Sequence, residues 1–304
     1  MTLNEITIND KDLIDRYLKL QCIESSEFTF TNLFMWRKSY DIKYAIVGDL
    51  ICFLPKHIGI NGGNPSVRSA SFPVGDVSRA DNVRAAVDEI LRYFEETNQP
   101  PIIRLCSEES VELLHQLFPG KFTITEDVNM FDYIYSIPEL ISLSGKKFHQ
   151  KRNHINKFKS LYEFEYRKVD RENLNDCVEL FGRWCKSCEE KDVDVSEGAE
   201  AFGEFVTNYD SLNVRGGGIY VGGKLVAFSF GEPLCQHTIS IHFEVADTEY
   251  HGAFPMINQQ FLEQEWSEYE FVNREEDMGL EGLRRAKRSY NPIGFIKKFV
   301  ATET

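Results

Sequence analysis

The sequence predicts an α+β protein made of two tandem domains, each a mixed sheet flanked by helices. Its 304 residues exceed what one ordinary hydrophobic core serves, and 42% hydrophobic residues are enough to fill two. Segments of helical and strand character also follow in a similar order in the two halves. Hairpin turns at Val47 and Val221, 174 residues apart, mark this repeat. The repeat indicates an old duplication, with two unrelated α+β domains as the alternative.

The first domain is expected to cover residues 1–140. Its helical segments place apolar residues three or four positions apart, as in Val83, Val87 and Ile90, and its strands alternate apolar and polar residues. We expect helices over residues 10–22, 32–37, 80–97 and 108–118. Strands are expected over residues 42–47, 50–54, 67–74, 102–106 and within 122–137, and a glycine-rich loop over 56–66.

The second domain is expected to cover residues 141–304. A hairpin turns at Gly222 and Gly223, because two adjacent glycines tolerate the backbone angles of a tight turn. We expect helices over residues 174–188, 253–266 and 280–290, and strands over 218–221, 224–230, 238–245, 270–273 and 294–300.

Positive charge is concentrated in two short windows of an acidic chain. The net charge is −14, yet residues 145–159 and 282–298 each hold six Lys or Arg and no Asp or Glu. In the first window Phe148, Ile155 and Phe158 have the spacing of one narrow buried stripe on a helix. Each window is either a solvated charged surface or an anion site. For an anion site, the residues expected to bind phosphate are Lys147, Lys151, Arg152, Arg284 and Arg288.

The same charge distribution bears on partners and location. Local rather than general positive charge argues against DNA binding and favours a phosphorylated small molecule or the end of a nucleic acid. No run of about 18 apolar residues and no secretory signal pattern occurs, so we expect a soluble cytoplasmic protein without an integral membrane segment. No metal is expected, because His149 and His154 are five residues apart, the wrong spacing for one helical face.

Residues 238–253 resemble the GNAT acyltransferase family. A strand at 238–245, the turn His251-Gly252-Ala253 and a following helix are similar to its central strand and donor turn. The resemblance implies that Phe243, Val245 and this turn bind the donor, with backbone N–H groups at the helix start facing its phosphates. The family's Gln/Arg-x-x-Gly-x-Gly/Ala pattern is only partly present. A coenzyme A thioester and an aminoacyl-tRNA therefore both stay open as donor.

Three residues are candidates for proton transfer. Tyr290 stands four residues before Gly294-Phe295, the family's Tyr-x-x-x-Gly-Phe spacing, which implies a proton donor to the leaving group. His242 and Glu244 alternate on the central strand, so we expect them to share the face that meets the acceptor. Packing within the core or exposure at the surface is the alternative for each of the three.

A second resemblance rests on three features: the doubled domain, the stretch GKKFHQKRNHINKF and the ending VNREEDMGLEGLRRAKRSYNPIGFIKKF. Together they resemble the carboxy-terminal domain of phosphatidylglycerol lysyltransferases and Fem-type peptidyltransferases. The resemblance implies transfer of an acyl or aminoacyl group from a phosphate-bearing donor, possible contact with the acceptor end of tRNA, and an amine or hydroxyl acceptor. Residues 70–75 contain Pro73 and open no helix directly, so the donor site of the first domain is expected to be degenerate. The alternative function is a non-catalytic module that binds a phosphorylated ligand.

Overall fold

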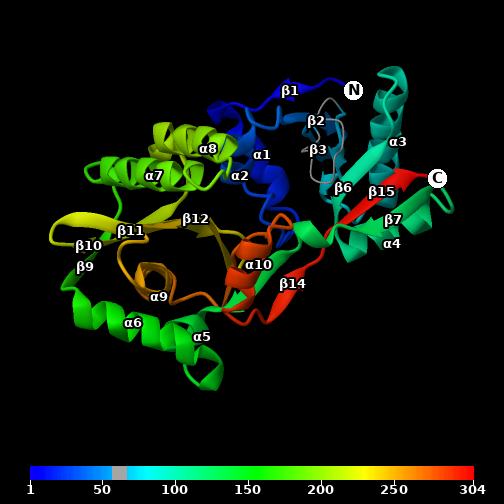
Figure 1. Ribbon diagram of the computed structural model, residues 1–304. Coiled ribbons are helices and arrows are strands. Elements are labelled where there is room, and N and C mark those ends of the chain that lie inside the picture. Colours follow the sequence, from blue (N-terminus) through cyan, green and yellow to red (C-terminus); the bar gives the residue numbers. More distant parts are fainter. Residues whose placement is uncertain (57–66) are drawn as a thin grey trace. The chain divides into compact units, whose positions relative to one another are not determined.

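A computed structural model describes residues 1–56 and 67–304, which form two compact units (Figure 1). The first unit comprises residues 1–132, 276–279 and 296–304, and the second comprises 133–275 and 280–295. The division falls before Tyr133 instead of near Leu140. It also differs from a simple tandem arrangement, because the end of the chain returns to the first unit. Most of the loop expected over 56–66 lies outside the described residues.

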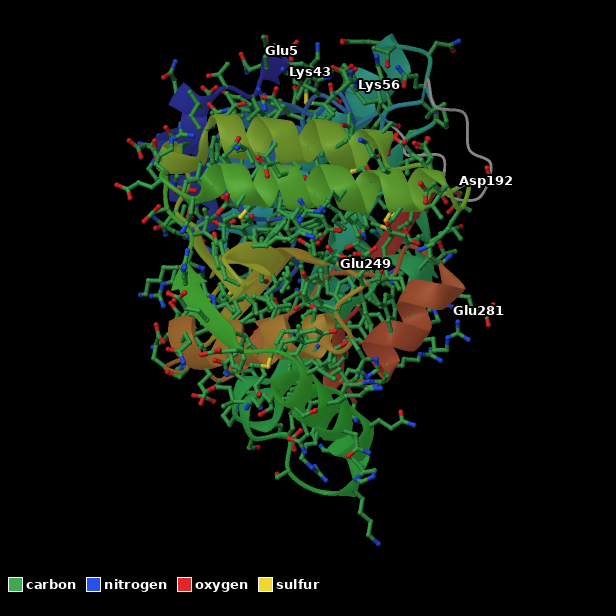
Figure 2. All side chains as sticks on the ribbon, turned by 60° about the vertical axis from the view of Figure 1, so that its left-hand side comes forward. Glu5, Lys43, Lys56, Asp192, Glu249 and Glu281 are labelled. Atoms are coloured by element: carbon green, nitrogen blue, oxygen red, sulfur yellow. The ribbon has the colours of Figure 1, made fainter. Side chains whose placement is uncertain are left out.

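The first unit contains two four-stranded sheets. Its helices are α1 (Lys11–Leu18), α2 (Phe30–Trp36), α3 (Ala80–Glu96) and α4 (Glu108–Leu117). Its strands are β1 (Asn4–Glu5), β2 (Lys43–Val47), β3 (Leu50–Leu54), β4 (Ala70–Ser71), β5 (Val74–Gly75), β6 (Ile102–Cys106), β7 (Phe122–Glu126) and β15 (Phe299–Glu303). The strand orders are β1-β2-β3-β5 and β4-β6-β15-β7, and Figure 1 shows β15 beside β6 and β7. Figure 2 labels Glu5 and Lys43, an ion pair between β1 and β2 at 2.7 Å.

Most helices and strands of this unit agree with the sequence. Helix α3 buries Val83, Val87 and Ile90 on the predicted face, and the β2–β3 hairpin turns at Gly48, whose φ of 59° favours glycine. The strand expected over 67–74 is instead two short strands, β4 and β5. Pro73 lies between them and lacks the N–H that a continuous ladder would need.

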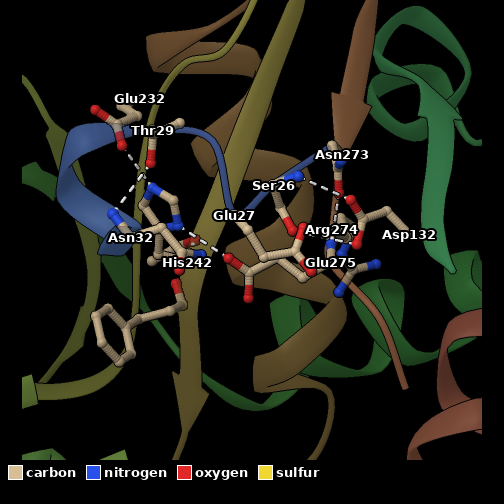
Figure 3. A network of polar contacts seen from close by, with 12 residues as sticks. Ser26, Glu27, Thr29, Asn32, Asp132, Glu232, His242, Asn273, Arg274 and Glu275 are labelled. Atoms are coloured by element: carbon tan, nitrogen blue, oxygen red, sulfur yellow. Dashed lines mark hydrogen bonds and ion pairs between the residues drawn. The ribbon is translucent and has the colours of Figure 1, made fainter. Parts of the chain in front are cut away.

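A buried ionic cluster holds the C-terminal strand in the first unit. Lys298 Nζ lies 2.6 Å from a Glu27 oxygen and 2.7 Å from an Asp132 oxygen, and its side chain is 2% exposed. The backbone N–H of Ser26 donates to Asp132 over 2.8 Å (Figure 3). Lys298 belongs to the second basic window of the sequence, but its charge is neutralised inside the protein. This cluster also separates β14 (Gly294–Ile296) from β15, where one strand over 294–300 was expected.

The second unit is built on a seven-stranded sheet of order β14-β8-β13-β12-β11-β10-β9. Its further strands are β8 (Asp132–Ser136), β9 (Phe164–Lys168), β10 (Arg215–Val221), β11 (Lys224–Pro233), β12 (Thr238–Ala246) and β13 (Phe271–Asn273). Its helices are α5 (Ile137–Ser142), α6 (His149–Leu161), α7 (Leu174–Glu189), α8 (Ser196–Thr207), α9 (Ala253–Glu265) and α10 (Glu281–Arg288). Helices α7 and α8 cover one face of the sheet, and α9 with α6 lies on the other (Figures 1 and 2).

Two features of β12 shape this sheet. Strand β12 pairs in parallel with β13 only over Thr238–Ser240, so the later part of β12 lacks β13 as a neighbour. A β-bulge also interrupts the pairing with β11, since Phe230 faces Phe243 but the next residue, Gly231, faces Ile241. His242 is the extra residue, and a bulge of this kind changes which side chains share a face.

The first basic window forms α6 as the sequence predicted. Phe148, Ile155 and Phe158 are buried in the core that α6 shares with α9. Among residues 1–56 and 67–304, no helix is long and apolar enough to cross a membrane.

Candidate functional site

A pocket of about 780 Å³ opens in the second unit where β12 and β13 diverge. Its walls come from α6, Trp184 of α7, the later part of β12, the turn before α9, the loop after β13, and α10. The lining residues used below are Lys151, His154, His242, Glu244, Asp247, Tyr250, His251, Gly252, Ala253, Pro255, Arg274, Glu275, Lys287 and Tyr290.

Arg274 is the central cation of this pocket. Its Nη2 donates to a Glu244 oxygen over 2.7 Å, and the other Glu244 oxygen accepts from the Asn258 side chain over 2.9 Å. Arg274 Nη1 is buried and has no hydrogen-bond partner among the described residues. A buried guanidinium nitrogen without an acceptor is costly unless a bound group supplies one. The guanidinium is therefore suited to an oxyanion in the pocket.

Tyr290 lies against this guanidinium. It is 6% exposed, and the Arg274 Cζ atom lies 4.5 Å from its ring centroid. Burial raises the pKa of the Tyr290 phenol above its ordinary value, against the opposing effect of Arg274. This phenol therefore keeps its proton at neutral pH and can donate it.

Lys151 faces Tyr290 from α6. Its Nζ lies 3.5 Å from the Tyr290 ring centroid. Burial first, and then the nearby charge of Arg274, lower the pKa of Lys151 to about 8. No ion-pair partner of Lys151 occurs in the part of the chain that the structure describes. A substantial fraction of this amine is therefore neutral near physiological pH and can accept a proton.

His242 does not have the role that the sequence suggested. Its Nε2 lies 2.8 Å from Glu232 and its Nδ1 lies 2.9 Å from Glu275 (Figure 3), and its side chain is 0% exposed. Burial opposes protonation, but the hydrogen bonds to Glu232 and Glu275 outweigh it and raise the pKa of His242 to about 10. With both ring nitrogens occupied, this imidazolium cannot act as a base.

His242 and Glu244 both line the pocket, but their contacts differ. The prediction that they share a face assumed unbroken alternation along the strand, whereas His242 is the extra residue of the bulge. Ile241 and Ala246, which are five residues apart, both pack in the core beside α9. Glu244 contacts α9 through Asn258, while His242 turns to the two carboxylates. His242 thus holds Glu275, the residue next to Arg274, in place.

The charge of His242 should make stability depend on pH. The pKa is about 10 in the folded protein and about 6.5 in the unfolded chain, so the contribution of His242 is complete below pH 6.5 and is lost as pH rises through 10. We expect the free energy of unfolding to fall by up to roughly 4 kcal/mol over this range. Urea denaturation at pH 6.5, 8 and 9.5 measures it. The fall should be much smaller in His242→Gln but unchanged in the exposed control His237→Gln, and equal slopes in all three proteins would refute the assignment.

The turn before α9 is less suited to a pyrophosphate than the sequence suggested. Gly252 has φ of 87°, and a Cβ there would lie 2.4 Å from the His154 carbonyl oxygen, so close packing against α6 requires this glycine. The Ala253 N–H donates to the Tyr250 carbonyl, and Pro255 has no N–H. Two of the first three amides of α9 therefore offer nothing to an anion.

Of the five basic residues expected to bind phosphate, Lys151 alone lines the pocket. Lys147 pairs with both carboxylate oxygens of Glu139 at 2.9 and 2.7 Å. Arg152 donates to the carbonyls of Leu143 and Gly145. Arg284 and Arg288 belong to α10 but to no described wall of the pocket.

Phe243 and Val245, expected at the donor site, are buried outside the pocket. The Phe243 ring lies 5.0 Å from Phe202 and 5.2 Å from Phe205 of α8, centroid to centroid. These aromatic contacts lie on the opposite face of the sheet from α9. Neither side chain of β12 is therefore placed to contact a ligand in the pocket.

Arg274 and His154 are site residues that the sequence reasoning did not single out. Arg274 stands within the stretch VNREEDMGL, whose resemblance to known transferases was the available signal. In the sequence, the nearest partner of His154 is His149, five residues away. In the structure His154 Nδ1 lies 3.1 Å from His251 Nε2, a contact between residues that are distant in sequence.

Comparison with known proteins bears on the family and the fold. The model of the phosphatidylglycerol lysyltransferase C-terminal domain family matches residues 21–302. A crystal structure of a conserved protein of unknown function from Bacteroides thetaiotaomicron VPI-5482 is 31% identical, with both chains 100% covered and a TM-score of 0.89. L-PGS from Bacillus licheniformis is 15% identical, with a TM-score of 0.59 over 88% of this chain and 89% of that one. FemX is 10% identical, with a TM-score of 0.59 over 99% and 97%.

The two more distant structures show the fold alone, and that fold is GNAT-like, as the sequence predicted. The family match, by contrast, spans nearly the whole chain. This chain therefore belongs to the phosphatidylglycerol lysyltransferase C-terminal domain family.

Proposed function

We propose that the second unit transfers an aminoacyl group from aminoacyl-tRNA to an amine or hydroxyl acceptor. Family membership and fold support an acyltransferase in general. The observation that carries the finer proposal is the grouping of Arg274, Tyr290 and Lys151 at one wall of the pocket. Acyl transfer requires a group that stabilises the developing negative charge, a proton donor and a proton acceptor. Arg274, Tyr290 and Lys151 can fill these three roles in that order.

The reaction would proceed by direct attack of the acceptor on the ester carbonyl carbon. The Lys151 amine takes the proton of the acceptor, and the carbonyl oxygen becomes an oxyanion that the Arg274 guanidinium stabilises. The bond from the carbonyl carbon to the ribose oxygen then breaks, and Tyr290 gives its proton to that oxygen. The Lys151 ammonium, which lies over the Tyr290 ring, returns a proton to the phenolate. Protons and charges balance without any other reactant.

The geometry of the α9 turn favours tRNA over coenzyme A as the donor. A coenzyme A pyrophosphate would need free backbone amides at the start of α9, and Ala253 and Pro255 do not supply them. Donor phosphates would then meet side chains, such as the imidazoles of His154 and His251, instead of a helix N-terminus.

Thermal protection distinguishes the donors. A ligand present at 100 times its dissociation constant should stabilise the protein by about 2.7 kcal/mol. We expect charged tRNA to raise the melting temperature and coenzyme A thioesters to leave it unchanged. Protection by acetyl-coenzyme A alone would contradict the donor assignment. Protection by charged tRNA without any loss of its aminoacyl group would indicate a binding module instead of an enzyme.

The pKa of Lys151 sets an expected pH dependence. Because the neutral amine is the active form, the transfer rate should rise with pH and level off above about pH 8. Lys151→Gln should lose this dependence and retain a low rate that is flat with pH. The control Lys121→Gln, at a lysine of the first unit whose side chain is 40% exposed, should keep the parent profile. A rising limb that persists in Lys151→Gln would show that another group titrates.

A further inference from the structure

Two histidines form a preorganised pair at the pocket. His154 comes from α6 and His251 from the turn before α9, and both line the cavity. Their bonded nitrogens are 3.1 Å apart, and their ring centroids are 5.0 Å apart. The close contact of Gly252 with the His154 carbonyl fixes the turn against the helix. The backbones that carry the two exposed imidazoles are therefore held next to each other.

The hydrogen bond between two imidazoles restricts their protons. One nitrogen of the bond carries a hydrogen and the other is bare. In the neutral pair, the two outer nitrogens, His154 Nε2 and His251 Nδ1, are then one donor and one acceptor. Adding a single proton makes both outer nitrogens donors and keeps the bond between the rings. The singly protonated pair can thus offer two N–H groups to one anion.

The surroundings of the pair leave that positive charge without a partner. Neither imidazole has an ion-pair partner among residues 1–56 and 67–304. Burial first, and then His251 and the charges of Lys151 and Lys157 of α6, lower the pKa of His154. The pocket carboxylates are already engaged: Glu244 by Arg274, Glu275 by His242, and Asp247 by Lys224 and Arg183. The remaining acid of the turn, Glu249, is exposed.

Aromatic rings and further cations adjoin the pair. Tyr250, next to His251, lies 5.2 Å from Tyr162, centroid to centroid, and both rings are half-buried. Lys224 Nζ lies 5.5 Å from the Tyr250 ring, and α6 carries Lys157 and Lys159 with no acidic residue. Cations interleaved with aromatic rings suit a single-stranded nucleic acid, whose bases stack and whose phosphates pair with the cations.

We propose that His154 and His251 form a proton-linked subsite for a backbone phosphate near the 3′ end of the RNA donor. The inference rests on the proposed function, which makes that donor an aminoacyl-tRNA. Above the pKa of the pair, each phosphate bound takes up one proton. Below it, the pair is already charged, and affinity no longer changes with pH.

Binding of the RNA trinucleotide CCA tests this subsite, because its phosphodiesters do not titrate between pH 5.5 and 8. At fixed ionic strength, its dissociation constant should rise by up to about tenfold per pH unit above the pKa of the pair. His154→Gln and His251→Gln should weaken binding at pH 5.5 and flatten this rise. The control His149→Gln, an exposed histidine on the same helix, should behave as the parent. The same pH slope in the parent and both pair variants would overturn the inference.

Nitrogen-15 spectra of the parent protein give a second test that needs no variant. Addition of the trinucleotide should raise the pKa of the His154 and His251 pair, and an unchanged titration would overturn the subsite. Soluble dihexanoyl phosphatidylglycerol serves as the other arm. If it alone raises that pKa, a lipid phosphate occupies the pair and the RNA assignment is wrong.

The subsite and the proposed function can fail separately. Transfer from charged tRNA without pH-linked trinucleotide binding overturns the subsite and leaves the function standing. If the trinucleotide binds with the expected pH slope but no aminoacyl group is transferred, the subsite is supported and the proposed transferase function is wrong.

Discussion

Tyr290→Phe is expected to slow aminoacyl transfer by roughly 10²- to 10⁴-fold, the usual cost of losing a general acid. The substitution keeps the ring that packs beneath Lys151 and Arg274 and removes only the hydroxyl. Because burial keeps the phenol protonated, its proton is available when the ribose oxygen leaves. Single-turnover kinetics with the protein in excess over charged tRNA measures the chemical step directly.

Tyr209→Phe is the matched control for this experiment. It deletes a hydroxyl that donates to the Val169 carbonyl over 2.9 Å, and Tyr209 does not line the pocket. Its transfer rate should stay within about twofold of the parent. If Tyr290→Phe also stays within about twofold, Tyr290 is a packing residue and the proton must come from elsewhere.

Lys298→Met should lower the free energy of unfolding by about 3–5 kcal/mol. Lys298 Nζ contacts both Glu27 and Asp132, and Asp132 is 0% exposed. Removing the cation leaves the buried Asp132 and the partly buried Glu27 without their partner, which costs far more than the pair itself contributes. Equilibrium urea denaturation at pH 7 gives the difference.

The neighbouring Lys297→Met provides the control for that stability measurement. Lys297 pairs with Glu108 at 2.9 Å, but both side chains are exposed, at 45% and 66%. Exposed pairs contribute at most about 1 kcal/mol. Equal losses in the two variants would show that the cluster is solvated and that Lys298 does not anchor the C-terminal strand.

Local pattern predicted much of the fold. The stripe of α6 and the apolar face of α3 follow from helical spacing, and the hairpin at Gly48 follows from turn chemistry, so each could be read without knowing its neighbours. Helix α8 was missed because Gly198 and Gly203 lower its helical propensity. Burial of Phe202 and Phe205 on the sheet stabilises it nonetheless.

Other features depend on contacts between distant residues. The return of β15 to the first unit requires the Lys298 cluster, whose members are 166 residues or more from Lys298. The bulge at His242 has no signal in the sequence of an apolar strand, although it changes how side chains alternate along β12. Tyr290 was predicted because a spaced motif marked it. Arg274 could not be identified from the sequence alone, because its place in the pocket depends on which strands diverge.

The unpaired guanidinium nitrogen of Arg274 offers the most direct test of the proposed transferase. The parent and Arg274→Gln are compared by the single-turnover release of radiolabelled amino acids from a mixture of charged tRNAs. Phosphatidylglycerol vesicles and a dipeptide amine are supplied as acceptors. The account predicts transfer by the parent, a rate roughly 10²- to 10³-fold lower in the variant, and similar affinity for charged tRNA in both. Transfer at the parent rate by Arg274→Gln would contradict it.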